Sequence, residues 1–126
     1  MIFMKKNKII KDPIYGYVEI PIEYISDIID TAVFQRLRRI VQTSYSPLYS
    51  SAVHNRFVHS IGVYHLGKIA TRYLLDGINL LNEINDKEIF KSYSEIFEIA
   101  CLLHDVGHAP FSHTGEEFYL DEKKGY

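Results

Sequence analysis

Cysteine, tryptophan and long apolar runs are scarce or missing in this sequence of 126 residues. Its single cysteine, Cys101, excludes an intramolecular disulfide and a zinc site built from several cysteines. No apolar run approaches the roughly 20 residues that a membrane-spanning helix needs, and the amino-terminal segment MIFMKKNKII lacks the apolar core of a signal peptide. We therefore expect a cytoplasmic protein that has no membrane segment.

An excess of one charge is also missing. Lysine plus arginine total 14 and aspartate plus glutamate total 16, which gives a net charge of −2. Nucleic-acid-binding proteins usually carry a basic excess, so we do not expect a nucleic-acid partner. Hydrophobic residues make up 47% of the chain and charged residues 24%, as in ordinary globular domains. The length is sufficient for one domain, which we place over residues 1–126.

The pattern of apolar residues predicts a mainly α-helical fold with a small β-hairpin at its start. Strand-forming residues flank Asp12-Pro13 and Gly16, which favour a turn, so residues 5–20 are the predicted hairpin. Residues 21–118 form the predicted helical core. Its expected helices begin at Pro21, run from 31 to 41 and from about 54 to 81, and run from Ser92 to a glycine stop at Gly107.

Apolar residues at helical spacing define the faces that we expect to be buried. In the helix at 31–41, Arg36, Arg38 and Arg39 are interpreted as solvated surface, and the apolar face consists of Val33, Phe34, Leu37, Ile40 and Val41. In the long helix the expected core residues are Phe57, Ile61, Leu66, Ile69, Tyr73 and Leu74. In the last helix they are Ile96, Ile99, Ala100 and Leu103.

Three of the six histidines gather with an aspartate in the segment HDVGHAPFSH, residues 104–113. Imidazole nitrogens and carboxylate oxygens together suit divalent manganese, magnesium, iron or zinc. His104 and Asp105 are adjacent, so both can lean toward one ion at a helix end, but another helix must complete the site. His59 on the long helix is the best candidate for a third ligand. Arg56 lies on the same helix face, where a guanidinium beside a metal ligand suits phosphate chemistry.

Packing alone is the alternative interpretation of these histidines. A single histidine in a helix is more often a packed core residue than a ligand, and we interpret His65 in this way. His104 and His108 also have the spacing of a zinc pair like that of HExxH, although the glutamate of that motif is missing. The gathering of several histidines near two helix ends favours the metal site.

Four segments carry a resemblance to a known family: DPIYGYVEIP, DTAVFQRLRRIVQ, HNRFVHSIGV and LLHDVGHAPFSH. In this order they resemble segments of the HD phosphohydrolase superfamily. The chain looks most like the deoxynucleoside triphosphate triphosphohydrolases, including the SAM-and-HD-domain type, from about Lys11 to Glu117. The resemblance implies an HD-domain helical bundle that holds a divalent metal through His59, His104 and Asp105. It also implies hydrolysis of a deoxynucleoside triphosphate to a deoxynucleoside and triphosphate.

The resemblance also assigns expected roles to individual substrate-side residues. Arg56 would bind the triphosphate and Gln42 would contact the deoxyribose. His108 and His113 would lie beside the α-phosphate, with His113 as the candidate general acid or base. Glu116, three residues after His113, is a candidate to orient it.

Regulation and assembly are further expectations from the resemblance. Asp30, Gln35 and Arg38 match a guanine-nucleotide regulatory site that some members of the family have. Members often form oligomers, so we expect a homo-oligomer.

One expected ligand has no match. The last metal-binding aspartate of the family lies on a later helix, and the chain reaches Tyr126 without a matching segment. Asp121, Glu116 and Glu117 are candidate substitutes, and their spacing favours none of them. We therefore expect a partial HD domain. The alternatives are a non-catalytic nucleotide-binding, metal-binding or oligomerisation module, and an HD phosphohydrolase of another nucleotide.

Overall fold

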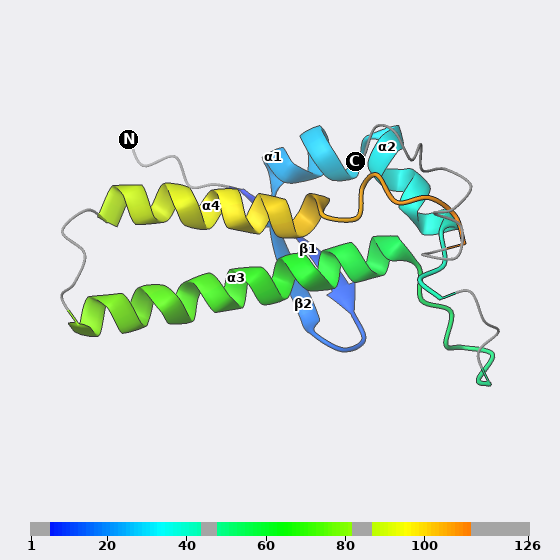
Figure 1. The fold of residues 1–126 in the computed structure, drawn as a ribbon, viewed down its shortest axis with the longest axis horizontal. Helices are drawn as coiled ribbons and strands as arrows, with labels where there is room; N and C mark the ends of the chain where they lie inside the picture. Colours follow the sequence, from blue (N-terminus) through cyan, green and yellow to red (C-terminus); the bar gives the residue numbers. More distant parts are fainter. Residues whose placement is uncertain (1–5, 44–47, 82–86, 112–126) are drawn as a thin grey trace, which may run out of the picture.

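The computed structural model describes residues 6–43, 48–81 and 87–111. Two antiparallel helices form its main layer, α3 (Arg56–Leu81) and α4 (Lys87–Leu103), and the short amino-terminal elements pack on one face of this layer (Figure 1). The predicted mainly α-helical fold with a small amino-terminal β-hairpin is confirmed. Within the described residues, no helix is long and apolar enough to cross a bilayer.

The hairpin consists of β1 (Asn7–Asp12) and β2 (Gly16–Pro21), paired antiparallel with Ile10 opposite Val18. The Asp12 carboxylate accepts hydrogen bonds from the backbone N–H groups of Ile14 (2.8 Å) and Tyr15 (3.0 Å), which closes the turn. Gly16 follows with a φ of +77°, a backbone conformation that glycine adopts without strain. Alternate residues of β2 then point into the core, as a half-buried strand requires.

The next elements are shorter and more irregular than the predicted helices. They are α1 (Ile22–Tyr24), a π-helical turn η1 (Ile25–Ile29), α2 (Ala32–Gln35) and a 3₁₀ turn η2 (Arg36–Arg39). The predicted beginning of a helix at Thr31 is confirmed, because Thr31 is the N-cap of α2 and its hydroxyl accepts from the Phe34 N–H at 3.3 Å.

The predicted helix to Val41 is wrong. Ile40 is extended, and its carbonyl accepts from the Arg56 N–H at 2.8 Å. Val41 forms an isolated bridge with Asn55 and is exposed. Backbone pairing with the segment before α3 thus ends this helix early.

The beginning of α3 agrees with the prediction, and the Asn55 side chain caps it by accepting from the Val58 N–H at 3.0 Å. The limits of α4 differ from the prediction. It begins at Lys87 rather than at Ser92, whose hydroxyl donates to the Glu88 carbonyl within the helix. It ends at Leu103 rather than at Gly107, and His104–Gly107 form a turn.

The core lies between the amino-terminal elements and one face of the α3–α4 layer. Its buried members are Val18, Ile20, Ile25, Ile29, Phe34, Leu37, Ile40, Phe57, Ile61, Tyr64 and Leu102. Leu66, Tyr73, Leu74 and Ile96 were predicted to be core residues, but they are 50%, 75%, 58% and 61% exposed. Val33 and Ala100, which were predicted to lie on buried apolar faces, are exposed as well. The described residues leave half or more of the Leu66, Tyr73, Leu74 and Ile96 side chains exposed, so in this chain that prediction is wrong.

Candidate metal centre

The antiparallel order of α3 and α4 brings the start of one helix beside the end of the other (Figure 1). His59 lies in the first turns of α3, whereas His104 and Asp105 lie in the turn that directly follows α4. The predicted helix to Gly107 would include His104 and Asp105, so that prediction is wrong for both residues. The turn instead directs both side chains toward His59, across a separation of 45 residues in the chain.

The three side chains form a compact triangle of possible metal ligands. The His59 and His104 Nε2 atoms are 3.2 Å apart, and Asp105 Oδ2 lies 3.7 Å from the first and 3.6 Å from the second. A point equidistant from these three corners lies about 2.0 Å from each, close to the length of a zinc–nitrogen or zinc–oxygen bond. The spacing of these donor atoms therefore fits a divalent cation.

Hydrogen bonding prepares His104 to donate a lone pair. Its Nδ1 lies 2.8 Å from the Cys101 carbonyl oxygen. A carbonyl only accepts hydrogen bonds, so Nδ1 carries the proton and Nε2 of the neutral ring keeps its lone pair. Metal-ligating histidines are commonly oriented by a bond of this kind.

The pKa of His59 is lowered below its ordinary value of 6.5. Burial is the largest cause, and the Asp105 carboxylate opposes it, while His104 and Arg56 lower the pKa further. The lowered pKa favours the neutral imidazole, which is the form that binds metals.

Arg56 supports the triangle from its buried side. Its Nη1 atom donates to Asp105 Oδ2 at 2.7 Å, and the two side chains are only 6% and 11% exposed. The imidazoles of His59 and His104 are 31% and 36% exposed. The site therefore has a buried, charge-paired carboxylate on one side and two accessible imidazoles on the other, where water or a substrate can approach.

Comparison with known proteins identifies the family. The HD domain family matches residues 56–126, which is more than half of the chain and includes all three candidate ligands. The chain belongs to the HD domain family.

Two curated relatives and one solved structure illustrate how far the similarity extends. The "Deoxynucleoside triphosphate triphosphohydrolase SAMHD1 homolog" of Dictyostelium discoideum is 45% identical over 123 residues, covering 96% of this chain and 22% of the relative. The uncharacterized protein YwfO of Bacillus subtilis is 41% identical over 122 residues, covering 95% of this chain and 26% of the relative. A hypothetical protein from Aquifex aeolicus, solved by crystallography, superimposes with a TM-score of 0.63 and 37% identity, covering 90% of this chain and 27% of that chain. The chain thus spans about a quarter of the length of these relatives.

The structure places some of the other predicted site residues near the triangle. Gln42 and His59 line one cavity of about 330 Å³, together with His54 and Gly62. His108 is half-buried three residues after Asp105, and its Nδ1 lies 2.9 Å from the Ala109 carbonyl oxygen. The substrate roles of Gln42 and His108 stay predictions. The predictions for His113 and Glu116 concern residues outside the described ranges.

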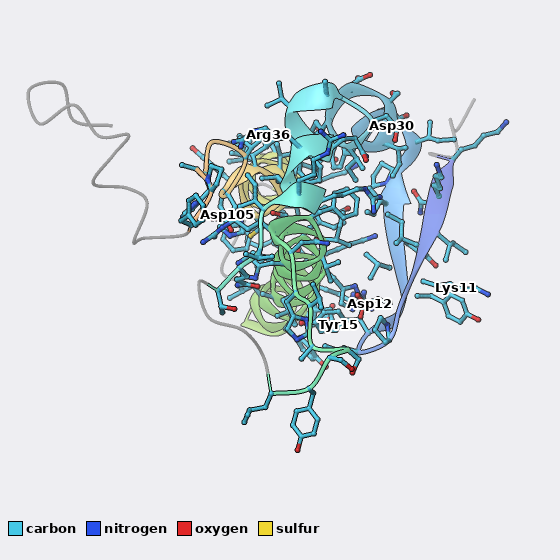
Figure 2. The ribbon with its side chains drawn as sticks, turned by 90° about the vertical axis from the view of Figure 1, so that its right-hand side faces the viewer. Lys11, Asp12, Tyr15, Asp30, Arg36 and Asp105 are labelled. Atoms are coloured by element: carbon cyan, nitrogen blue, oxygen red, sulfur yellow. The ribbon has the colours of Figure 1, made fainter. Side chains whose placement is uncertain are left out.

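The predicted regulatory residues are only partly brought together. Arg38 Nε donates to Gln35 Oε1 at 2.8 Å, and the Arg38 guanidinium lies 3.6 Å from the centre of the Phe57 ring. Asp30 lies on the hairpin side of α2, away from Asp105 (Figure 2). Binding of a nucleotide by these residues stays a prediction.

Arg36 was predicted to be solvated surface, and that prediction is wrong. The structure shows it half-buried, with its guanidinium hydrogen-bonded to two carbonyls of the segment that follows Asp105. No local signal distinguishes Arg36 from Arg38 and Arg39, because its partners are 70 and 72 residues away in the chain.

Proposed function

We propose that this HD domain belongs to a metal-dependent phosphohydrolase whose substrate is a deoxynucleoside triphosphate. The reaction would consume water and yield a deoxynucleoside and inorganic triphosphate. The observation that carries the proposal is the triangle of His59, His104 and Asp105, whose donor atoms lie within 4.8 Å of one another. The similarity to a relative named for this activity supports the choice of substrate.

A divalent cation in the triangle would polarise a phosphoryl oxygen and activate water for attack on phosphorus. The residues of the chain would bind and orient the substrate around it. Arg56 holds the Asp105 carboxylate, and its positive charge would attract phosphate oxygens to the same place. Gln42 would contact the deoxyribose from the neighbouring cavity.

Proton transfer is proposed for the segment that follows Asp105. His108 and His113 would lie beside the α-phosphate, and His113 would act as the general acid or base for the leaving deoxynucleoside or the attacking water. Glu116 would orient His113.

Metal analysis combined with product analysis tests this proposal. The purified chain of 126 residues would be assayed for bound manganese, iron, zinc and magnesium, and then incubated with each deoxynucleoside triphosphate. We expect triphosphate release that depends on added Mn²⁺ or Mg²⁺ and disappears in Asp105→Ala. The matched control is Asp76→Ala, which removes an exposed carboxylate from α3 and should leave both metal content and turnover unchanged.

A metal-binding module without catalysis is the second candidate function. The observation that favours it is the size of the ligand set, because the described residues contain one group of possible ligands and it has three members. Three protein ligands plus water suffice for a catalytic zinc site. Metal retention without turnover of any nucleotide would support the module. Turnover of ribonucleotides or other phosphate esters alone would indicate an HD phosphohydrolase with another substrate.

A further inference from the structure

Arg36 connects the amino-terminal half of the chain to the segment that carries the metal ligands. Its Nη2 atom donates to the Val106 carbonyl at 2.7 Å, and its Nη1 atom donates to the His108 carbonyl at 2.9 Å. In Figure 2 the labelled Arg36 lies between α2 and the segment after α4, next to Asp105. The guanidinium therefore binds the two carbonyls that bracket Gly107, immediately after a candidate metal ligand.

Backbone hydrogen bonds also shape the segment that Arg36 contacts. The Val106 N–H donates to the Leu103 carbonyl at 3.0 Å, and the His108 N–H donates to the Asp105 carbonyl at 2.9 Å. These bonds use N–H groups of the turn, whereas the Val106 and His108 carbonyls accept from the Arg36 guanidinium. A helix end also carries partial negative charge, which a cation stabilises.

The geometry of arginine suits this task better than that of lysine. A planar guanidinium presents parallel N–H groups at fixed spacing, so one side chain can hold two acceptors in a defined relation. The two bonds to Arg36 thus fix the path of the backbone from Val106 to His108 relative to η2. Since Asp105 directly precedes this segment, the same bonds limit the directions available to its carboxylate.

We propose that Arg36 is a positioning residue of the metal centre, which acts by holding the Val106–His108 backbone so that Asp105 and His108 keep their orientation. The inference rests on the proposed metal site. It assigns to Arg36 no contact with the metal or the substrate. Its neighbour Arg39 is exposed in the same 3₁₀ turn and provides a matched comparison.

Cobalt binding to the complete chain tests this role. Co²⁺ would be titrated into wild type, Arg36→Ala, Arg36→Lys and Arg39→Ala, with affinity and visible absorption measured at a temperature where circular dichroism shows every variant folded. Loss of an outer partner of a metal ligand typically lowers metal affinity by about 10- to 100-fold. We expect a loss on the order of tenfold in Arg36→Ala with an altered absorption spectrum, a smaller loss in Arg36→Lys, and wild-type binding in Arg39→Ala.

The outcomes separate this inference from the proposed function. Equal Co²⁺ affinity and equal spectra in wild type and Arg36→Ala would overturn the role of Arg36 and leave the metal site intact. Absence of Co²⁺ binding in the folded wild type would overturn both. If Arg36→Ala does not fold, Arg36→Lys decides: weaker Co²⁺ binding supports the positioning role, and wild-type affinity refutes it.

Discussion

Removal of the Arg56 guanidinium is expected to lower the melting temperature of the protein. It is also expected to increase the amount by which a divalent metal raises that temperature. The two partners of the ion pair are almost fully buried, with a closest nitrogen–oxygen distance of 2.7 Å, so solvent screens their attraction only weakly. Arg56→Ala would leave the Asp105 carboxylate buried without this charge partner. An uncompensated buried charge is among the largest single destabilising changes known in proteins.

The magnitude follows from the burial of the pair. Removing one partner of a buried ion pair costs about 3–5 kcal/mol of unfolding free energy. Asp105 retains 11% side-chain exposure, which gives water some access to the carboxylate. We therefore expect a loss of about 3 kcal/mol of unfolding free energy, at the lower end of that range. For a domain of 126 residues this loss corresponds to a fall in melting temperature of roughly 10–15 °C.

Metal should recover part of this loss. A divalent cation in the triangle would replace the missing positive charge beside Asp105. Removing the guanidinium also removes a repulsion of that cation on the order of 5 kcal/mol at an effective dielectric constant of 20. We therefore expect Mn²⁺ to raise the melting temperature of Arg56→Ala by more than it raises that of wild type. Thermal unfolding followed by circular dichroism, with and without Mn²⁺, measures both quantities.

Arg72→Ala is the matched control, because Arg72 is an exposed arginine on the same helix. Its effect on stability should stay within about 0.5 kcal/mol. The reasoning is refuted if Arg56→Ala melts within about 2 °C of wild type, since that shift corresponds to less than about 1 kcal/mol. It is also refuted if Mn²⁺ stabilises both proteins equally, because the carboxylate would then not be shared between guanidinium and cation.

Three further predictions concern single side chains. His59→Ala should abolish Mn²⁺ binding in isothermal titration calorimetry while the circular dichroism spectrum stays folded, because it removes one of three donor atoms; retained affinity would exclude His59 as a ligand. Gly67→Ala should destabilise the protein by about 1–3 kcal/mol in urea unfolding, because the added Cβ would lie 2.7 Å from Cys101 Sγ. The Cβ added in Gly77→Ala meets no atom within 4 Å, so this substitution should stabilise α3 by up to about 1 kcal/mol. Equal effects of the two substitutions would contradict close packing of α3 on α4. Tyr64→Phe should leave the free energy of unfolding unchanged or raise it by about 1 kcal/mol, because the buried Tyr64 hydroxyl has no hydrogen-bond partner among the described residues. A loss above about 1 kcal/mol in the same urea assay would indicate that this hydroxyl is hydrogen-bonded.

Sequence patterns predicted the elements whose signals are local. The turn of the hairpin follows from Asp12, which bonds to backbone N–H groups two and three residues later, and from Gly16. The starts of α2 and α3 follow from the capping side chains of Thr31 and Asn55. Such bonds join residues that are close in the chain, so composition over a few positions is enough to predict them.

The predicted helix limits and buried faces were wrong where contacts between residues far apart in the chain override the local preference for a helix. The helix predicted to reach Val41 ends earlier, because Ile40 and Val41 pair with the segment before α3. Leu66 and Tyr73 have helical spacing on α3, but the described residues leave half or more of each side chain exposed. A periodic pattern identifies an apolar face and does not show what packs against it.

The sequence by itself determined the chemistry that is available at the candidate metal centre: imidazole nitrogens, a carboxylate and nearby guanidinium groups. The tertiary structure alone decided which of these groups meet. His59 joins His104 across 45 residues, and Arg36 reaches the His108 carbonyl across 72. The physical reason is that a metal site depends on distances of a few ångströms between donor atoms, and packing of α3 against α4 sets those distances. Nothing in the sequence distinguishes Arg36 from Arg39. The path of the folded backbone places the Arg36 guanidinium against the Val106 and His108 carbonyls and leaves Arg39 exposed to solvent.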